Sequence, residues 1–445
     1  MNKLAAFFHN KDVLNRVLFT LAIFFVFRIG FAITVPGVKV NESVWDNRYD
    51  AFSILNMMGG GALQNFSIFA LGVSPYITSQ IIVQLLSMDV LPALTQMTKE
   101  GETGRKKLDV VNRMLAVILA AIQAYGIIVA LQNADGLTLV DSSAWGYVKI
   151  VIFMVAGSMM LNWMGDQITD KGIGNGISMM IFVGIISSLP SQLANAFDTF
   201  LKNNVNTGDP SLILQGAVQI FIYILAFVAI IIFVTFIEKS VRKLPVSHSN
   251  QSQAIEEESM QSSFLPIKVN ASSVMPVIFA SSIMVAPSII ISLFSNGNPP
   301  DWAKKIEEVF NYQALTTMGN VKFPWGTIIY AVLIIMFAYF YSQLEINPER
   351  IAENFQNSGT YITGVKPGTE TQRYISRILY RITFMGSLAL TFIALLPLIL
   401  TLTGAVPQSL ALGGTGLIIV VGVTLEVYNQ INGIMAGNGY VESEL

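Results

Sequence analysis

Few residues in this sequence have the types and spacing that catalysis or metal binding requires. The chain has no cysteine and only two histidines, His9 and His248, far apart in sequence, so neither a thiolate nucleophile nor a zinc site is expected. Within the apolar runs Arg28 is the clearest charge, and Glu345 and Glu426 lie near the ends of later runs. Ion-coupled carriers depend on ionisable residues inside the membrane, and no series of Asp, Glu and His crosses any apolar run here. The sequence predicts no enzyme, no cofactor and no metal.

The glycine-rich segment KGIGNGIS (171–178) is the stretch that most suggests nucleotide chemistry. Glycines before a helix can hold a phosphate, but this spacing is neither GxGxxG nor a P-loop, and a long apolar run follows it. We predict a tight turn that leads into the next apolar segment, with a helix start that faces a pore as the alternative.

The elements that must position these residues are apolar segments of membrane-spanning length. The chain of 445 residues is 53% hydrophobic and 12% charged, whereas a soluble domain has about 25% charged residues, so an integral membrane protein is expected. The first segment is expected to be a retained helix because no small-residue cleavage site follows it. Ten segments are long enough to span a bilayer, with approximate limits 15–35, 66–87, 110–131, 147–165, 173–194, 212–237, 271–295, 325–344, 378–402 and 408–428.

The distribution of basic residues predicts the orientation of the chain. An even number of spans places both termini on one side of the membrane. Most Lys and Arg residues lie at the N-terminus and in the loops after the second, fourth, sixth and eighth segments, so the positive-inside rule predicts cytoplasmic termini. Three of these loops, 88–109, 238–270 and 345–377, are longer than about a dozen residues, which is typical of functional loops.

The stretch from Phe52 to Leu86 differs from an ordinary membrane helix. It begins with a half-apolar lead-in and three consecutive glycines, and each glycine in a helix interior costs about 1 kcal/mol relative to alanine. The continuation is apolar for about twenty residues but carries several polar side chains. We predict a short mobile piece followed by a spanning segment with one polar face.

Apolar residues at helical spacing allow two interpretations. Val73 and Ile77 are four residues apart, as are Ile177 and Ile181, so each pair shares a helix face. Such residues either face lipid and pack against other helices or form an apolar constriction that excludes water and ions. The residues alone do not decide between the two.

Amides in or near the second, third and seventh segments also allow two interpretations. Gln84, Gln123 and Asn270 either hold helices together by hydrogen bonds worth about 1 kcal/mol each or lie at a seam that opens. Neither interpretation is favoured by the sequence.

Long sequence blocks give the chain a resemblance to a known family. At GGGALQNFSIFALGVSPYITSQIIVQLL (59–86) it resembles the SecY family, the central subunit of the protein-translocation channel. The similarity covers nearly the whole chain, with the apolar segments in the right order. It continues through KEGETGRKK (99–107), GDQITDKGIGNGIS (165–178), LPIKVNASSVMPVIFASSI (265–283), NPER (347–350), SGTYITGVKPG (358–368) and GGTGLIIVV (413–421).

The resemblance implies an all-α polytopic membrane protein and a role for several residue groups. Ten transmembrane helices would form a clamshell of two pseudo-symmetric five-helix halves, 1–195 and 212–445, joined by a hinge connection at 196–211. An aliphatic pore ring at the waist would consist of Val73, Ile77, Ile177, Ile181, Ile278 and Ile419. A plug at about 52–65 would include Phe52, Leu55, Met57, Met58, Gly59, Gly60, Gly61 and Leu63. A lateral gate between the second and seventh segments would include Ile81, Gln84, Gln123, Asn270 and Ser273.

The resemblance also implies partners and a location. The chain would lie in the bacterial plasma membrane with a SecE subunit and commonly SecG. It would pass unfolded polypeptides across and release signal sequences and membrane helices into lipid. The SecA ATPase or the ribosome would drive it, so ATP hydrolysis would reside in a partner. Docking to that motor would use the basic residues Arg105, Lys106, Lys107, Lys239, Arg242, Lys243, Arg350, Lys366 and Arg373.

Three features depart from the family pattern. The loop tip SHSNQSQAIEEESMQSS (247–263) is polar and acidic where the family is usually basic, Lys366 stands where the family typically has arginine, and the chain ends at Leu445 without a basic tail. Lysine keeps the charge but lacks the planar guanidinium fork. Two other classes stay open: a secondary transporter built from inverted repeats, and a non-conducting insertase.

Overall fold

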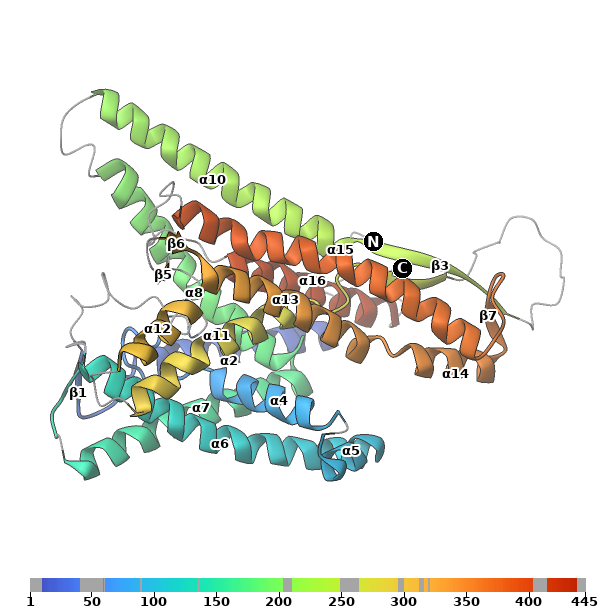
Figure 1. The fold of residues 1–445 in the computed structure, drawn as a ribbon, viewed down its shortest axis with the longest axis horizontal. Coiled ribbons are helices and arrows are strands. Elements are labelled where there is room, and N and C mark those ends of the chain that lie inside the picture. The colour runs from blue at the N-terminus through green and yellow to red at the C-terminus, as the bar shows by residue number, and fades with distance from the viewer. Residues whose placement is uncertain are drawn as a thin grey trace.

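The protein is a bundle of long helices with small sheets at both ends (Figure 1). In chain order, the ten helices of the described chain that coincide with the ten expected spans are α2 (Lys11–Ala32), α4 (Ser74–Leu86), α6 (Glu102–Asn133), α7 (Ala144–Lys171), α8 (Gly176–Phe197), α10 (Pro210–Lys239), α11 (Met275–Phe294), α13 (Trp325–Glu345), α15 (Thr369–Leu402) and α16 (Gly414–Gly437). Shorter helices are α5 (Pro92–Lys99), η2 (Asp198–Lys202), α12 (Asp301–Phe310) and α14 (Pro348–Ser358). The computed structural model describes residues 10–40, 59, 61–88, 90–133, 137–141, 143–202, 210–248, 264–294, 300–311, 316–318, 321–402 and 414–437.

The helix in the second expected span, 66–87, is shorter than the apolar segment. Residues 61–73 form tight turns, with Phe66 and Gly72 at φ of 45° and 58°, and regular helix begins only at Ser74. Pro75 lies in the first helical turn, where its missing N–H and fixed φ favour helix initiation. The 13 residues of α4 extend about 20 Å, less than the ~30 Å hydrocarbon core. By length and composition, eight helices of the described chain qualify as membrane spans, and α4 is not among them.

The turn segment before α4 is held by α7. A Cβ on Gly157 would lie 2.0 Å from the backbone oxygen of Ile68, so the two backbones touch at this point. The neighbouring Ser158 Oγ donates a hydrogen bond to the carbonyl of Gly72 over 3.0 Å. Only glycine permits so close an approach, which explains how irregular backbone is accommodated inside a helical bundle.

Helices from both parts of the sequence meet in one apolar core. In the first part α4 packs on α6, α6 on α7, and α7 on α8 and α2; in the second, α11 packs on α13, α13 on α15, and α10 on α16. The two groups join where α11 meets α4 and α6 and where α16 meets α8. The largest buried cluster contains side chains from α2, α4, α7, α8, α10, α11, α13, α15 and α16.

A three-stranded antiparallel sheet at one end joins two of the long loops. Its strands are β3 (Val241–His248), β4 (Phe264–Lys268) and β7 (Thr360–Ile362), with β3 in the centre. Arg242 pairs with Ile267, and Ser247 pairs with Tyr361. The sheet packs through Leu244 and Ile267 on α15. The loops after α10 and α13 therefore form one folded unit.

The opposite end carries two strand pairs, and the first and last described helices meet at the sheet end. The pairs are β1 (Val38–Val40) with β2 (Leu137–Leu139), and β5 (Thr316–Met318) with β6 (Val321–Phe323). Val13 near the start of α2 and Met435 near the end of α16 share a small apolar cluster with Ile173. The start of α2 and the end of α16 thus lie at the same end of the bundle, as expected for an even number of spans.

Candidate functional site

The six residues expected to form a pore ring belong to one apolar cluster. Five of them are at most 4% exposed and lie in the central core, and the sixth, Ile177, is partly buried and packs against it. They come from the turn before α4 and from α4, α8, α11 and α16. The set reads Val73, Ile77, Ile177, Ile181, Ile278 and Ile419. An aliphatic cluster contributed by helices from both ends of the sequence offers no hydrogen-bond partner, so it can exclude water and ions when it is closed.

The glycine-rich segment at 171–178 positions the two residues of α8 that were expected in the ring. Asn175 caps this helix, and its Oδ1 accepts hydrogen bonds from the backbone N–H of Ile177 (3.1 Å) and Ser178 (3.4 Å). A Cβ on Gly176 would lie 1.7 Å from the carbonyl oxygen of Gly165, so α7 and α8 touch at their backbones. The predicted tight turn is confirmed, and the helix that it opens carries Ile177 and Ile181 into the central cluster.

The expected plug lies only partly within the described residues. Phe52, Leu55, Met57, Met58 and Gly60 fall outside them. Gly59 is buried, Gly61 has φ of 87°, and Leu63 is fully buried in a second apolar cluster with residues of α6, α7 and α11. The described part of this segment is therefore packed into the protein beside the core.

The seam between α4 and α11 contains some of the expected gate residues. Ile81 is 5% exposed and belongs to the central cluster. Gln84 accepts a hydrogen bond from the hydroxyl of Tyr341 on α13 over 2.5 Å. Gln123 of α6 is 8% exposed, and its Oε1 has no hydrogen-bond partner among the residues that the structure describes. Tyr341 was not among the residues expected from the sequence, where it is one aromatic residue in the run FAYFYSQLE of the eighth apolar segment.

Asn270 and Ser273 lie just before α11 and make contacts with α10 and α16. The Nδ2 of Asn270 donates to Glu238 Oε1 at the end of α10 over 2.5 Å and to the carbonyl of Ser273 over 3.1 Å. Ser273 has φ of 50° and lies beside Gly422 of α16. Asn270 thus bonds to the end of α10 and Ser273 lies beside α16, whereas Gln84 bonds to α13. The sequence could not show this, because the residues just before α11 turn toward α10.

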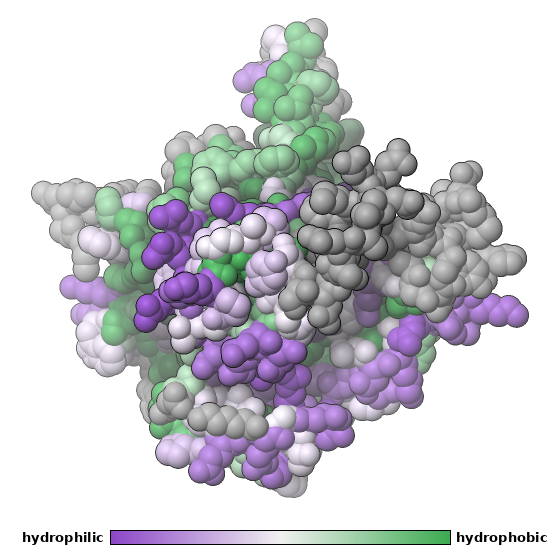
Figure 2. Space-filling model, turned by 90° about the vertical axis from the view of Figure 1, so that its right-hand side faces the viewer, coloured by the Kyte–Doolittle hydropathy of each residue, from purple (hydrophilic) through white to green (hydrophobic). Residues whose placement is uncertain are grey.

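The basic residues expected to dock a motor are all exposed. They gather at the end that carries α5, α14 and the three-stranded sheet, which is the polar face in Figure 2. Some have local partners: Lys106 pairs with Glu102 (3.2 Å), and Lys107 pairs with Glu100 (2.8 Å). The exposed basic residues expected to dock a motor are Arg105, Lys106, Lys107, Lys239, Arg242, Lys243, Arg350, Lys366 and Arg373.

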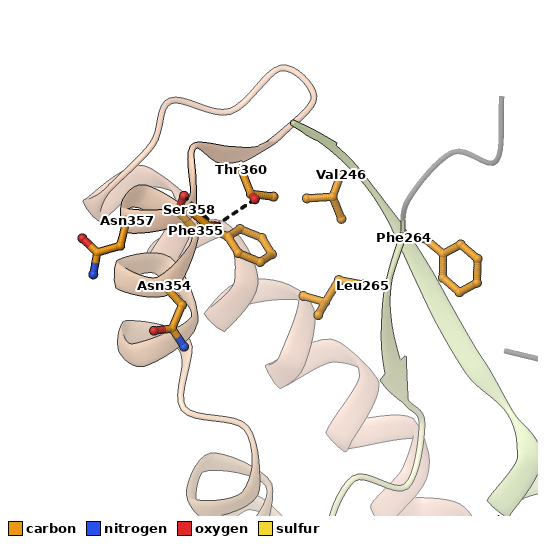
Figure 3. Close-up of a pocket in the computed structure, with 8 residues that line it drawn as sticks. All are labelled: Val246, Phe264, Leu265, Asn354, Phe355, Asn357, Ser358 and Thr360. Atoms are coloured by element: carbon orange, nitrogen blue, oxygen red, sulfur yellow. Dashed lines mark hydrogen bonds between the residues drawn. The ribbon is translucent and has the colours of Figure 1, made fainter. Parts of the chain in front are cut away.

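Local geometry shapes two parts of this polar face. The loop that presents Lys366 is closed by Thr371 Oγ1, which donates to the Lys366 carbonyl over 2.9 Å, and turns at Gly364 and Gly368, both with positive φ. A shallow cleft of about 600 Å³ lies between the sheet and α14 (Figure 3). Its lining residues are Val246, Phe264, Leu265, Asn354, Phe355, Asn357, Ser358 and Thr360.

A central apolar cluster, a polar seam and a basic folded end belong to a polytopic membrane protein with the fold of protein-conducting channels. The fold resembles a solved structure described as "The structure of a protein conducting channel", with a TM-score of 0.66 at 17% identity over 98% of this chain and 96% of that one. It also resembles Sec61 in a canine ribosome-channel complex, with a TM-score of 0.63.

Sequence relatives give the family. The SecY family matches residues 67–428. The chain is 41% identical to protein translocase subunit SecY 1 of Lactobacillus kefiranofaciens over 98% of this chain and 97% of the relative. It is 42% identical to protein translocase subunit SecY of Halalkalibacterium halodurans over 97% of each. The chain belongs to the SecY family. This assignment replaces the secondary-transporter alternative.

Proposed function

We propose that this protein is the channel-forming subunit of a protein translocase, through which unfolded polypeptides cross the membrane. The observation that carries the proposal is the single apolar cluster formed by the six ring residues, in a chain that matches the family over nearly its whole length. Aliphatic side chains suit this task because they can surround any passing side chain without binding it, and they exclude water when the channel is empty.

The proposed gate lies between α4 on one side and α11 and α13 on the other. The two groups of helices pack mainly within themselves, and they meet at α11 with α4 and α6 and at α16 with α8. This arrangement supports a clamshell whose halves are residues 1–195 and 212–445. The connection at 196–211 includes the end of α8 and then η2, which follows α8 directly. Separation at the α4–α11 seam would open a lateral path to lipid for signal sequences and membrane helices. Residues 52–65 would act as the plug that blocks the pore on its outer side.

The exposed basic residues at the sheet end of the bundle and the exposed apolar side chains of α10 suggest partners for this protein. Solved relatives include Sec61 in a ribosome-channel complex and a yeast Ssh1 complex bound to the 80S ribosome. By analogy the exposed basic residues would dock a ribosome or the SecA ATPase, and both termini would be cytoplasmic in a bacterial plasma membrane. Helix α10 is strongly apolar, with exposed Leu214, Phe221 and Phe236, which suits lipid or the helix of a SecE or SecG subunit.

The test of the proposed function is the ion leak of the resting channel. Ile77→Gly and Ile278→Ser remove aliphatic groups that are 3% and 2% exposed in the cluster, so each should raise the basal conductance of planar bilayers that contain the purified channel. Val234→Ala is a matched control, because Val234 is equally buried in the same cluster but comes from α10 and not from the ring. Basal conductance of both ring variants equal to that of the control, with equal insertion, would refute the ring.

A further inference from the structure

The short helix α12 lies at the end of the bundle opposite the three-stranded sheet (Figure 1). It packs on α11 and α13, which precede and follow it in the chain and coincide with two of the expected spans. Its ten residues extend about 15 Å, half of the ~30 Å hydrocarbon core. The helix is therefore too short to cross a bilayer, and it lies near the ends of two helices that do cross it.

One face of α12 is turned toward the protein. Ala303 is 2% exposed, and Glu307 and Phe310 are partly buried. These positions are four and seven residues apart along the chain, so they form one stripe on the helix. Phe310 also packs against the central apolar cluster. Helix α12 is therefore packed on the bundle along this stripe.

A second face of α12 is apolar and open. Trp302 is 66% exposed, Ile306 is 39% exposed, and Val309 is partly buried. Each of these residues comes one position before a member of the packed stripe, so the open face lies about 100° around the helix from it. A helix on the surface of a water-soluble protein carries polar residues beyond its packed face. The open face of α12 therefore suits an apolar medium and not water.

The remaining side of α12 is charged. It points away from both apolar stripes, because a helix places residues about 100° apart. Its exposed charged residues are Asp301, Lys304, Lys305 and Glu308. Two of them, Asp301 and Lys304, lie 3.9 Å apart. A helix with one face for the protein, one for an apolar medium and one for water matches the boundary between lipid and water.

Two other exposed aromatic side chains lie at the same end of the bundle. Phe323 ends β6 and Trp325 begins α13; they are 40% and 41% exposed, and their ring centroids are 4.9 Å apart. Helix α13 packs on α12. Tryptophan is enriched where a bilayer meets water, because its ring is amphipathic. These neighbours favour lipid as the partner of the open face.

We propose that α12 binds the surface of the bilayer, with Trp302, Ile306 and Val309 inserted among the lipid headgroups and the upper acyl chains. The partner is phospholipid and not another protein chain. The charged side of the helix, with Lys304 and Glu308, stays in water. The proposal goes beyond the proposed function, because it requires only that α11 and α13 span the membrane.

Spin labels on α12 test the proposal. The chain contains no cysteine, so each single cysteine variant carries one nitroxide in the full-length channel, reconstituted in vesicles of phosphatidylethanolamine and phosphatidylglycerol. The measurement is the collision rate of each label with lipid-soluble oxygen relative to a water-soluble nickel chelate. This ratio should be severalfold higher for Trp302→Cys and Ile306→Cys than for the controls Lys304→Cys and Glu308→Cys.

Two outcomes of the label measurement would overturn the proposal. Equally low ratios at all four positions would place the open face in water. Immobile labels at positions 302 and 306 that are shielded from both reagents would show a protein partner instead of lipid. Because all four side chains are exposed, the variants should fold, and an unchanged thermal unfolding temperature verifies this.

A second experiment asks whether the open face drives the insertion. Trp302→Ser with Ile306→Ser removes most of the apolar surface and leaves the packed stripe intact, so a label at Val309→Cys should lose contact with oxygen and gain contact with the nickel chelate. Lys304→Ser with Glu308→Ser is the matched control and should leave that label in lipid. An unchanged label in the first pair would refute the proposal. Neither measurement depends on conduction, so failure of the proposed channel function is detected separately.

Discussion

Replacing Gly157 with alanine should disturb the contact between α7 and the turn segment before α4. The added Cβ would lie 2.0 Å from the backbone oxygen of Ile68 and 2.8 Å from its carbonyl carbon. Ordinary contacts begin at about 3.4 Å, so the turn segment at 66–73 or α7 has to shift by more than 1 Å. Overpacking of this kind costs about 1–3 kcal/mol, and the better helix propensity of alanine offsets up to about 1 kcal/mol of it. A net destabilisation of about 1–2 kcal/mol is expected.

The displacement should also reach the proposed ring, because Val73 follows directly after Gly72, whose carbonyl is bonded to Ser158. Gly157→Ala should therefore lower the thermal unfolding temperature of the purified channel and raise its basal conductance. Gly433→Ala is the control, since a Cβ at Gly433 of α16 meets no atom of the described residues within 4 Å, and it should be neutral or slightly stabilising. Equal unfolding temperatures and conductances for the two variants would refute the reasoning.

Two further predictions concern the ends of the bundle. Lys366→Glu reverses the charge on an exposed loop that Thr371 closes. It should reduce secretion of translocated reporters at least severalfold and leave the unfolding temperature unchanged. Normal secretion would remove Lys366 from the proposed docking surface. Burial, and then the neighbouring Glu308, raise the pKa of Glu307 on α12, so the folded protein holds this proton more tightly than the unfolded chain. Stability should fall as pH rises from the usual pKa of glutamate (about 4.3) through the raised value. Glu307→Gln should therefore flatten the dependence of the unfolding temperature on pH over that interval, and an unchanged dependence would contradict this prediction.

The sequence predicted the helices better than the contacts between them. Ten spans were found because continuous apolar runs are a strong signal. The shortness of α4 was missed because hydropathy averages over the turns at 66–73, which are apolar but not helical. The pairing of β3 with β7 joins residues more than a hundred positions apart, and no local sequence pattern predicts such a pairing.

Single residues show the same limit at the site. Gln84 and Asn270 have the same chemistry and were expected at the same seam, but one bonds to α13 and the other to α10. Tyr341 was missed because a tyrosine inside an apolar run looks like packing until its hydroxyl partner is known. The resemblance to the SecY family supplied the ring residues, and the aliphatic spacing alone did not.

The contacts of α4 indicate which side of the helix separates when the gate opens. On its α6 side, Ser79 is fully buried and its Oγ lies 2.7 Å from the carbonyl of Asn112, which is 7% exposed. Breaking that bond would leave buried polar groups unpaired at a cost of about 1–3 kcal/mol. On its α13 side only Tyr341, at 8% exposed, is buried, whereas Gln84 is half-buried and its amide can bond to water. Since α7 also holds the turn before α4 through Gly157 and Ser158, α4 should move together with α6 and α7, and separation should occur at α11 and α13.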